Sequence, residues 1–418
     1  MSDAQPTQKP VILISGGGTT IPLARHLAER YDLVFWSPQA AQAVADSGIR
    51  NVAALGALVD AEINEQADAT LAAITARAVN GMPQITRSLV GAYAGMPQIE
   101  QLRPERLRDW WPAMVMTQLR GVIPALAALD KLGEARTVVA AVVHEDVTLE
   151  MRALVGWCRT RNIPTVHVPH APCHLRPDAG RDIHTETRAD WIAASGQYMA
   201  EFYARYGFPA ERIRITGAPQ WDNLYRGSVP ERAEAKQIMG VKGEPRVMGY
   251  ATTWWQTTSL RGGFENELNV GFETVLAAAR ALEAFLIVKV HPNEGQSEDA
   301  YKAVLEQYGV RGLITRHHLT YAVRAMDVLV AQGPSNLCIE AAILGTPSVY
   351  IQTAGFDYAT PLPLRVQTGN PGALMAAIQA GGEATPDDWE AMLTTYNAAH
   401  PDGGAAERAA EFVAEIAG

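Results

Sequence analysis

Short apolar runs of strand length alternate in the first half of this chain with longer segments in which apolar residues recur at helical spacing. The apolar runs predict strands at Val11–Ser15, Leu33–Trp36, Val52–Leu55, Thr137–Val143 and Thr165–Val168. Helix-length segments include Ile21–Arg30, Ala61–Val79 and Leu149–Arg161. Because strands that alternate with helices are typical of a parallel sheet with covering helices, we predict an α/β domain.

The same alternation starts again after Tyr225–Lys242, a charged segment with glycine and proline that is typical of a connection between domains. The predicted strands of this second half are Arg246–Ala251, Ala284–Val290, Gly312–Thr315, Asp327–Ala331 and Ser348–Ile351. The predicted helices are Val270–Leu282, Asp299–Tyr308, Thr320–Met326 and Leu337–Leu344. From Trp389 to Gly418 the pattern is helical again, with a break at Pro401–Gly404. Two α/β halves result.

The stretch from Gly81 to Gly133 is helical in pattern but is interrupted by five prolines, so we expect several short helices there. It contains the pair Trp110 and Trp111, with three arginines nearby. A packed core helix is the favoured interpretation of this pair. The alternative is an amphipathic face that touches a membrane or a lipid-linked acceptor.

Composition narrows the classes of function. The 418 residues are 48% apolar and 19% charged, which suits a globular protein of two or three domains. A net charge of −10 has the wrong sign for binding nucleic acid over a wide face, although a small anionic ligand can still occupy a local basic site. Three scattered cysteines, no secretory leader and no apolar run long enough to span a bilayer favour a cytoplasmic protein.

A glycine-rich turn, Gly16, Gly17 and Gly18, follows the first predicted strand and precedes a helix. It lacks the third glycine of a dinucleotide fingerprint, where Ile21 stands, and no acidic residue follows the next strand to hold a ribose. Two interpretations stay open. The glycines either let the helix pack closely on its strand or turn backbone amides toward a ligand in a cleft between the two halves.

Polar residues follow three of the predicted strands in the second half, at the edge where open α/β sheets bind ligands. They are Thr252, Thr253 and Trp254 after the first strand, Lys289 and His291 at the second, and Ser335, Asn336 and Glu340 where a helix opens. Lys289 and His291 share a strand face and could converge on one anion. Trp254 could stack on a base or sugar, or pack in the core. Together these strand ends indicate a ligand site.

A zinc site is a further possibility raised by the cluster His167, His170, Cys173 and His174, because these are zinc-ligand residue types. The spacing lacks the second paired half of structural zinc sites, and one histidine lies within a predicted strand. We therefore expect no bound metal.

Several stretches of the sequence resemble the GT-B superfamily of nucleotide-sugar-dependent glycosyltransferases. The resemblance is strongest to the branch that contains CDP-glycerol glycerophosphotransferases and non-hydrolysing UDP-N-acetylglucosamine 2-epimerases. The stretches are Val166–His170, Ile215–Asp222, Tyr250–Trp254, Val288–Pro292, Gly333–Pro347 and Asp402–Arg408.

The resemblance implies two Rossmann-like α/β/α domains that face each other across a cleft. Residues 1–225 would bind the acceptor, residues 226–395 would bind the nucleotide donor, and a helix within 396–418 would cross back to the first domain. Ser335, Asn336 and His291 would face the diphosphate, and Glu340 would hold the ribose. Thr252 and Thr253 would line the same pocket. The turn formed by Gly217, Pro219 and Asp222 would do structural work near the hinge.

The resemblance also implies a general base on the first domain. His170 matches a histidine that faces the cleft in such enzymes. His144, Glu145 and Asp146 compete with it, because they follow the strand Thr137–Val143 and would open on the same cleft.

The expected activity is transfer of a sugar from a nucleoside diphosphate sugar to an acceptor hydroxyl, with inversion and without a metal or a permanently bound cofactor. The acceptor would be a glycan, a lipid-linked molecule or another hydroxyl compound, and the protein could touch the membrane peripherally. A CDP-glycerol-type phosphotransferase, a sugar-nucleotide epimerase and a non-catalytic nucleotide-sugar-binding protein are the alternatives. The segment Gln332–Ser335 replaces the phosphate turn of the CDP-glycerol enzymes, and this departure favours a sugar donor.

Overall fold

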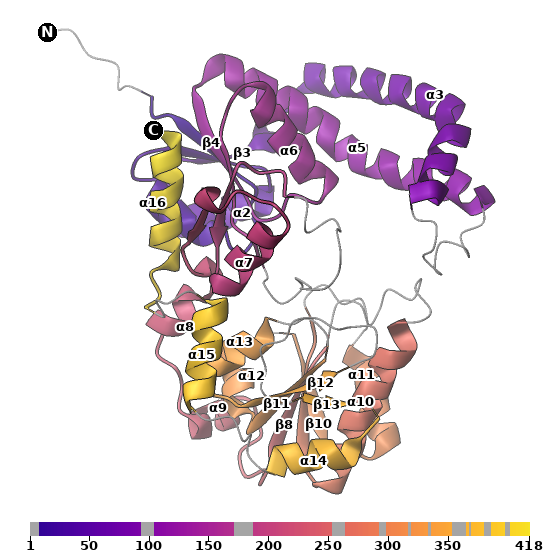
Figure 1. The fold of residues 1–418 in the computed structure, drawn as a ribbon, viewed down its shortest axis with the longest axis vertical. Helices are drawn as coiled ribbons and strands as arrows, with labels where there is room; N and C mark the ends of the chain where they lie inside the picture. Colours follow the sequence, from indigo (N-terminus) through magenta and orange to yellow (C-terminus); the bar gives the residue numbers. More distant parts are fainter. Residues whose placement is uncertain are drawn as a thin grey trace, which may run out of the picture.

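A computed structural model of the chain describes most of its residues. The described residues are 8–92, 104–170, 187–252, 264–291, 298–316, 319–332, 336–352, 365–367, 369–379, 386–397 and 402–418. Two parallel sheets form two domains, drawn one above the other in Figure 1. Both are mixed α/β, as the sequence predicts.

The N-terminal sheet has seven parallel strands in the order β3-β2-β1-β4-β5-β6-β7. Their bounds are β1 Val11–Ile14, β2 Asp32–Phe35, β3 Val52–Ala54, β4 Val138–Val143, β5 Thr165–His167, β6 Trp191–Ala194 and β7 Ile213–Ile215. The strand order reverses between β1 and β4, and in such sheets ligands bind outside the carboxyl ends of the strands at this switch point. The sequence pattern missed β6 and β7.

The C-terminal sheet repeats the arrangement with six parallel strands in the order β10-β9-β8-β11-β12-β13. Their bounds are β8 Val247–Ala251, β9 Phe285–Lys289, β10 Gly312–Thr315, β11 Val328–Gln332, β12 Ser348–Gln352 and β13 Arg365–Gln367. The switch point lies between β8 and β11. The three strand ends selected from the sequence are those of β8, β9 and β11, which are neighbours in this sheet.

Helices cover both sheets. Around the N-terminal sheet they are η1 Ile21–Leu23, α1 Ala24–Leu27, α2 Pro38–Asp46, η2 Leu55–Leu58, α6 Leu149–Thr160, α7 Gln197–Arg205 and η3 Ala210–Arg212. Around the C-terminal sheet they are α9 Arg232–Ile238, α10 Phe264–Ala281, α11 Glu298–Tyr308, α12 Leu319–Ala325, α13 Leu337–Ile343 and α14 Pro371–Gln379. Between the domains lie η4 Pro219–Trp221, α8 Asp222–Arg226 and α15 Pro386–Tyr396.

The prediction of several short helices between β3 and β4 was wrong. Two long helices, α3 Ala61–Ala92 and α5 Pro104–Ala135, pack along each other and project from the domain (Figure 1). Pro104 occupies the first residue of α5, where a proline costs no hydrogen bond. Pro83, Pro112 and Pro124 lie inside the two helices and remove one hydrogen bond each, and contact with the partner helix keeps the helices continuous. The side chains of Trp110 and Trp111 lie outside the described part. In that part, no helix is both long and apolar enough to cross a membrane.

The last helix, α16 Ala405–Ala417, returns to the N-terminal domain (Figure 1). Its alanines and Phe412 lie in one core with Ile12 and Ile14 of β1. The start of α16 is capped from a distant segment, because the Asp222 carboxylate accepts hydrogen bonds from the amides of Ala405 at 3.0 Å and Ala406 at 2.7 Å.

The turn before Asp222 is shaped by the approach of the same helix. Gly217 has a φ of 93°, and a Cβ there would lie 2.8 Å from the Cβ of Ala405, so only glycine fits. Arg408 of α16 donates to the carbonyl of Thr216 at 2.9 Å. The turn from Gly217 to Asp222 thus holds the crossing helix.

Candidate functional site

Three loops meet at the switch point of the N-terminal sheet: the glycine turn after β1, His144 to Asp146 after β4, and Val168 to His170 after β5. The Oγ of Ser15 lies 2.7 Å from Nδ1 of His144 and accepts the His144 backbone amide at 3.0 Å. A Cβ on Gly17 would lie 2.3 Å from Cγ of His144, whereas one on Gly18 would meet nothing within 4 Å. Gly17 is therefore required so that the His144 ring can lie against the turn.

His144 is an uncharged ring in this position. Burial, with smaller contributions from the neighbouring His170 and His167, lowers its pKa from 6.5 to about 4. The hydroxyl of Ser15 lies against Nδ1, and a hydroxyl pairs with either tautomer of the neutral ring because it both donates and accepts. One ring nitrogen accepts in either tautomer, so His144 stays a base candidate.

His170 lies where the two domains meet. Its main-chain carbonyl accepts two side-chain amides, from Gln220 of η4 at 3.3 Å and from Asn336 at the start of α13 at 3.1 Å. Its ring lies edge-on to that of His144, with 6.2 Å between the ring centres. Residues of the hinge and of the C-terminal domain therefore hold the loop that presents His170.

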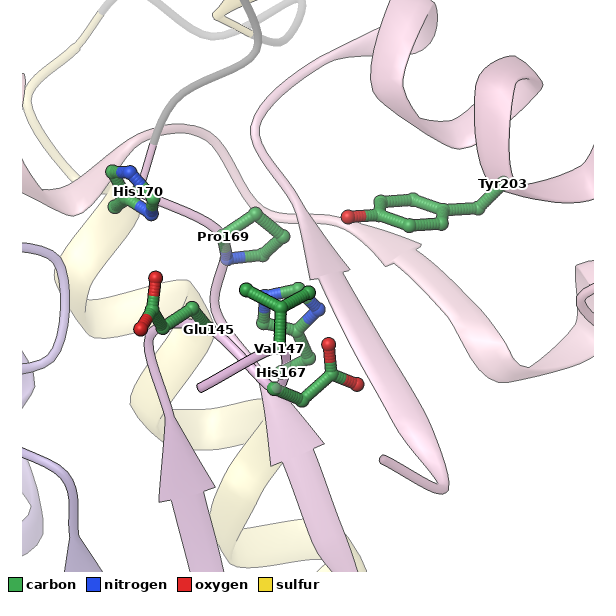
Figure 2. Close-up of a pocket in the computed structure, with 7 residues that line it drawn as sticks. Glu145, Val147, His167, Pro169, His170 and Tyr203 are labelled. Carbon is green, nitrogen blue, oxygen red and sulfur yellow. The ribbon is translucent and has the colours of Figure 1, made fainter. Parts of the chain in front are cut away.

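Glu145 and Asp146 have different surroundings. Both line a small pocket, and Figure 2 shows the Glu145 carboxylate below the ring of His170. Asp146 is 2% exposed, and its Oδ2 accepts the backbone amides of Arg188 and Ala189. A buried carboxylate that accepts two amides fixes the chain before β6. Asp146 therefore has a structural partner in that segment, whereas the Glu145 carboxylate lies near the ring of His170.

The residues predicted to bind the donor lie at the ends of β8 and β9. Thr252, itself buried, accepts the backbone amide of His291 at 2.9 Å, and Arg316 donates to the carbonyl of His291 at 3.1 Å. Burial, and then the charge of Lys289, lower the pKa of His291. Thr252 thus acts here by positioning the loop that carries His291.

Lys289 is 7% exposed, and its ammonium donates to the carbonyl of Arg316 at 2.9 Å. Burial lowers the pKa of this lysine, while Glu340 nearby opposes that shift. Glu340 accepts a hydrogen bond from the indole of Trp221 at 3.2 Å, and burial raises the pKa of its carboxyl. Lys289 therefore supplies positive charge beneath the site. The hinge residue Trp221 thus contacts the C-terminal domain.

Some of the predicted site residues lie outside the described part of the chain, and several residues near the site were not predicted from the sequence. Thr253, Trp254 and Ser335 lie outside the described residues, as do Cys173 and His174 of the candidate zinc cluster. No group of three metal-ligating side chains occurs in the part that is described. Ser15, Gln220, Trp221 and Arg316 were missed as site residues. Of these, Gln220 and Trp221 lie inside the stretch Ile215–Asp222, and the family resemblance of that stretch was the signal that could have identified them.

Comparison with known families identifies the enzyme class. The profile of the CDP-glycerol:poly(glycerophosphate) glycerophosphotransferase family matches residues 175–413, more than half of the chain. The chain belongs to this family. The matched region begins between β5 and β6 in the chain and runs through the C-terminal domain into α16. None of the curated proteins matches the chain.

Solved structures with the same fold include UDP-GlcNAc 2-epimerases. The Neisseria meningitidis enzyme, bound to UDP-GlcNAc, has a TM-score of 0.57 at 13% identity over 97% of this chain and 100% of its own. The Methanocaldococcus jannaschii enzyme gives 0.56 at 12% identity over 98% and 100%. Anabaena HepE in complex with UDP-glucose gives 0.55 at 12% over 96% and 99%. At these identities the likeness establishes the GT-B fold of this chain.

Proposed function

We propose that this protein transfers a phosphate-linked polyol from a cytidine diphosphate donor to the hydroxyl of an acceptor. The family match over residues 175–413 carries the proposal, because it covers the whole donor half. The hydrogen bonds from Gln220 and Asn336 to the carbonyl of His170 support it, since they bring the base candidate to the domain that would hold the donor.

In this reaction the acceptor oxygen attacks the phosphorus that carries the polyol. The bond from that phosphorus to the bridging oxygen breaks, and CMP leaves with this oxygen. His170 takes the acceptor proton, while His291, Ser335 and Asn336 face the diphosphate and Glu340 holds the ribose. The positive charge of Lys289 stabilises the negative charge of the diphosphate. The reaction as proposed needs no bound metal or permanent cofactor.

Glycosyl transfer is the second candidate. The segment Gln332–Ser335, which departs from the phosphate turn of CDP-glycerol enzymes, favours it, and the fold is shared with Anabaena HepE, a structure that holds UDP-glucose. Here the bond between the sugar carbon and the diphosphate breaks, so a nucleoside diphosphate leaves. The two candidates therefore differ in the nucleotide released. The acceptor would be a glycan, a lipid-linked molecule or another hydroxyl compound, at a cytoplasmic site that could adjoin the membrane.

The nucleotide product separates these reactions. The purified protein is incubated with CDP-glycerol and glycerol 3-phosphate or with UDP-, GDP-, CDP- and dTDP-sugars, and the products are identified by chromatography and mass spectrometry. Acceptor-dependent CMP release supports polyol phosphate transfer, whereas release of a nucleoside diphosphate indicates glycosyl transfer. Interconversion of a free sugar nucleotide indicates an epimerase, and calorimetric binding without turnover indicates a binding protein.

His170→Ala tests the assigned base. We expect turnover to fall by at least about a hundredfold, as for loss of a general base, while the calorimetric affinity for the nucleotide stays within about threefold. Retained turnover in this variant would remove His170 from the reaction and leave Glu145 as the candidate, to be tested by Glu145→Gln.

A further inference from the structure

The short turn η4 contacts both domains through two adjacent side chains. Gln220 donates to the main-chain carbonyl of His170 at 3.3 Å, in the N-terminal domain. The next residue, Trp221, donates from its indole Nε1 to Oε1 of Glu340 at 3.2 Å, in the C-terminal domain. One turn thus contacts a residue of each domain to which the proposed reaction gives a role.

The indole of Trp221 is fixed by its packing. Trp221 is 0% exposed and lies in one hydrophobic core with Ile339 of α13 and Tyr396 of α15. The turn is also held at its start, because the amide of Ala218 donates to Oδ1 of Asn397 at 2.9 Å. A side chain that is packed on all sides keeps its N–H at a defined place, so this donor can orient the group that accepts from it.

The carboxylate of Glu340 uses one of its two oxygens in this contact. Glu340 lies in the first turn of α13 and keeps part of its surface accessible. Among the described residues, Trp221 is the hydrogen-bond donor to this carboxylate, and Oε2 has none. Each carboxylate oxygen can accept more than one hydrogen bond, so Oε2 can accept from a hydroxyl group of a ligand.

Trp221 also favours the ionised form of Glu340. Burial raises the pKa of this carboxyl, and the hydrogen bond from Trp221, followed by the charge of Lys289, opposes that shift. An ionised carboxylate makes stronger hydrogen bonds to hydroxyls than a neutral acceptor does. Loss of the indole N–H would therefore affect both the orientation and the charge of the carboxylate.

We propose that Trp221 is a positioning residue for the nucleotide donor: it holds Oε1 of Glu340, so that Oε2 accepts a hydrogen bond from a ribose hydroxyl. The proposal rests on the proposed function in one respect, namely that Glu340 holds the ribose. It adds that recognition of the ribose depends on η4. Because the same turn holds the loop of His170 through Gln220, ribose recognition and the placement of His170 share one support.

Equilibrium binding of nucleotides tests this role without turnover. The probes are CDP and UDP, each compared with its 2′,3′-dideoxy counterpart, which lacks both ribose hydroxyls. In the variant protein the indole of Trp221 is replaced site-specifically by benzothiophene, which has nearly the same shape but no N–H, so the packing of the core is kept. We expect the preference for ribose over dideoxyribose to fall about tenfold, while the affinity for the dideoxy nucleotides stays within about twofold of wild type.

A purely structural role of Trp221 would change the affinity for both kinds of nucleotide equally. An equal loss for both, or an unchanged preference for ribose, would overturn the proposal. In a Glu340→Ala background the preference should already be lost, and the benzothiophene replacement should change it by less than about twofold. A further fall in that background would show that the indole acts by another route, and would also overturn the proposal.

Gln220→Met is the matched control, because it removes the other hydrogen bond of η4 and leaves the indole in place. We expect the preference for ribose to stay within about twofold of wild type in this variant. A fall as large as that of the benzothiophene variant would show that a displaced turn, and not the indole N–H, causes the effect.

The two proposals can fail separately. If CDP or UDP binds but no polyol phosphate is transferred, the proposed function fails, and the preference for ribose still decides the role of Trp221. If transfer occurs and the preference is unchanged in the benzothiophene variant, the role of Trp221 fails alone. If neither nucleotide binds, both proposals fail.

Discussion

The side-chain amide of Asn336 donates a 3.1 Å hydrogen bond to the main-chain carbonyl of His170, 166 residues earlier in the chain. A residue of the C-terminal domain thereby holds the loop that carries the base candidate of the N-terminal domain. Gln220 of the hinge donates to the same carbonyl at 3.3 Å. Placement of His170 is thus linked to the relative position of the two domains.

Asn336→Asp tests this link. The substitution keeps the shape of the side chain but puts a carboxylate oxygen against the carbonyl of His170, where two acceptors repel each other. We expect kcat to fall about tenfold, from the loss of one hydrogen bond and the added repulsion. Gln220→Glu, at a residue not assigned to the donor, should reproduce the fall. A rise in donor KM alone in Asn336→Asp would show that Asn336 holds phosphate and does not position His170.

Gly17→Ala should impair turnover while Gly18→Ala should not. The added Cβ at residue 17 would lie 2.3 Å from Cγ of His144 and must displace its ring, whereas the space at residue 18 is open within 4 Å. We expect at least a tenfold loss of turnover in the first variant and less than a twofold change in the second. Equal activity of the two variants would show that the position of His144 does not matter.

The pKa of His144 predicts a loss of stability in acid. The folded ring has a pKa of about 4 instead of 6.5, so between these values the unfolded chain binds a proton that the folded chain does not. Above pH 6.5 the uncharged His144 ring makes its full contribution to the free energy of unfolding. This contribution, about 3 kcal/mol at most, is lost as the pH falls toward 4. Urea unfolding from pH 7.5 to 4 measures it.

His144→Asn is the matched variant for that pH series, because its side-chain amide can still hydrogen-bond to Ser15 but does not titrate. The free energy of unfolding should fall less steeply with decreasing pH than in the wild type. A residual slope is expected, since burial also lowers the pKa values of His167 and His291. Identical slopes would contradict the uncharged state of His144.

Trp221→Phe should destabilise the domain junction. It removes the indole N–H that Glu340 accepts at 3.2 Å, and a hydrogen bond to a buried charged group contributes about 1.5–3 kcal/mol. In a Glu340→Gln background, Trp221→Phe should lower the free energy of unfolding by less, because a neutral amide loses less than a carboxylate when the indole N–H is removed. Urea unfolding of the four proteins forms a double-mutant cycle, and additive costs would show that the two residues are not coupled.

Asp222→Ala should weaken the attachment of α16. The carboxylate caps two amides of this helix, so we expect a loss of about 1–2 kcal/mol and faster hydrogen exchange in residues 405–417. Asp402→Ala is the control, because Asp402 also accepts an amide, that of Gly404 at 2.8 Å, but its side chain is 59% exposed. Asp402→Ala should lower the free energy of unfolding by less than Asp222→Ala does. A larger loss of stability in Asp402→Ala would exclude Asp222 as the main cap of α16.

The periodicity of apolar residues predicted the two α/β halves and most of their strands. A buried parallel strand is a short continuous apolar run, and an amphipathic helix has apolar residues at helical spacing, so both can be read from neighbouring residues. It also selected Lys289, His291 and Glu340, which the structure gathers at the ends of β9 and β11. The short strands β6, β7 and β13 were missed, since three or four residues carry little periodic signal.

Only the tertiary structure decided the roles of several residues. Asp146 was a base candidate by sequence, but its carboxylate accepts two amides from a segment about forty residues later. The helices α3 and α5 stay long despite their prolines because they pack on each other. The contact of Asn336 with His170 depends on how two domains dock. Local sequence patterns cannot specify such contacts, because they depend on packing between segments far apart in the chain.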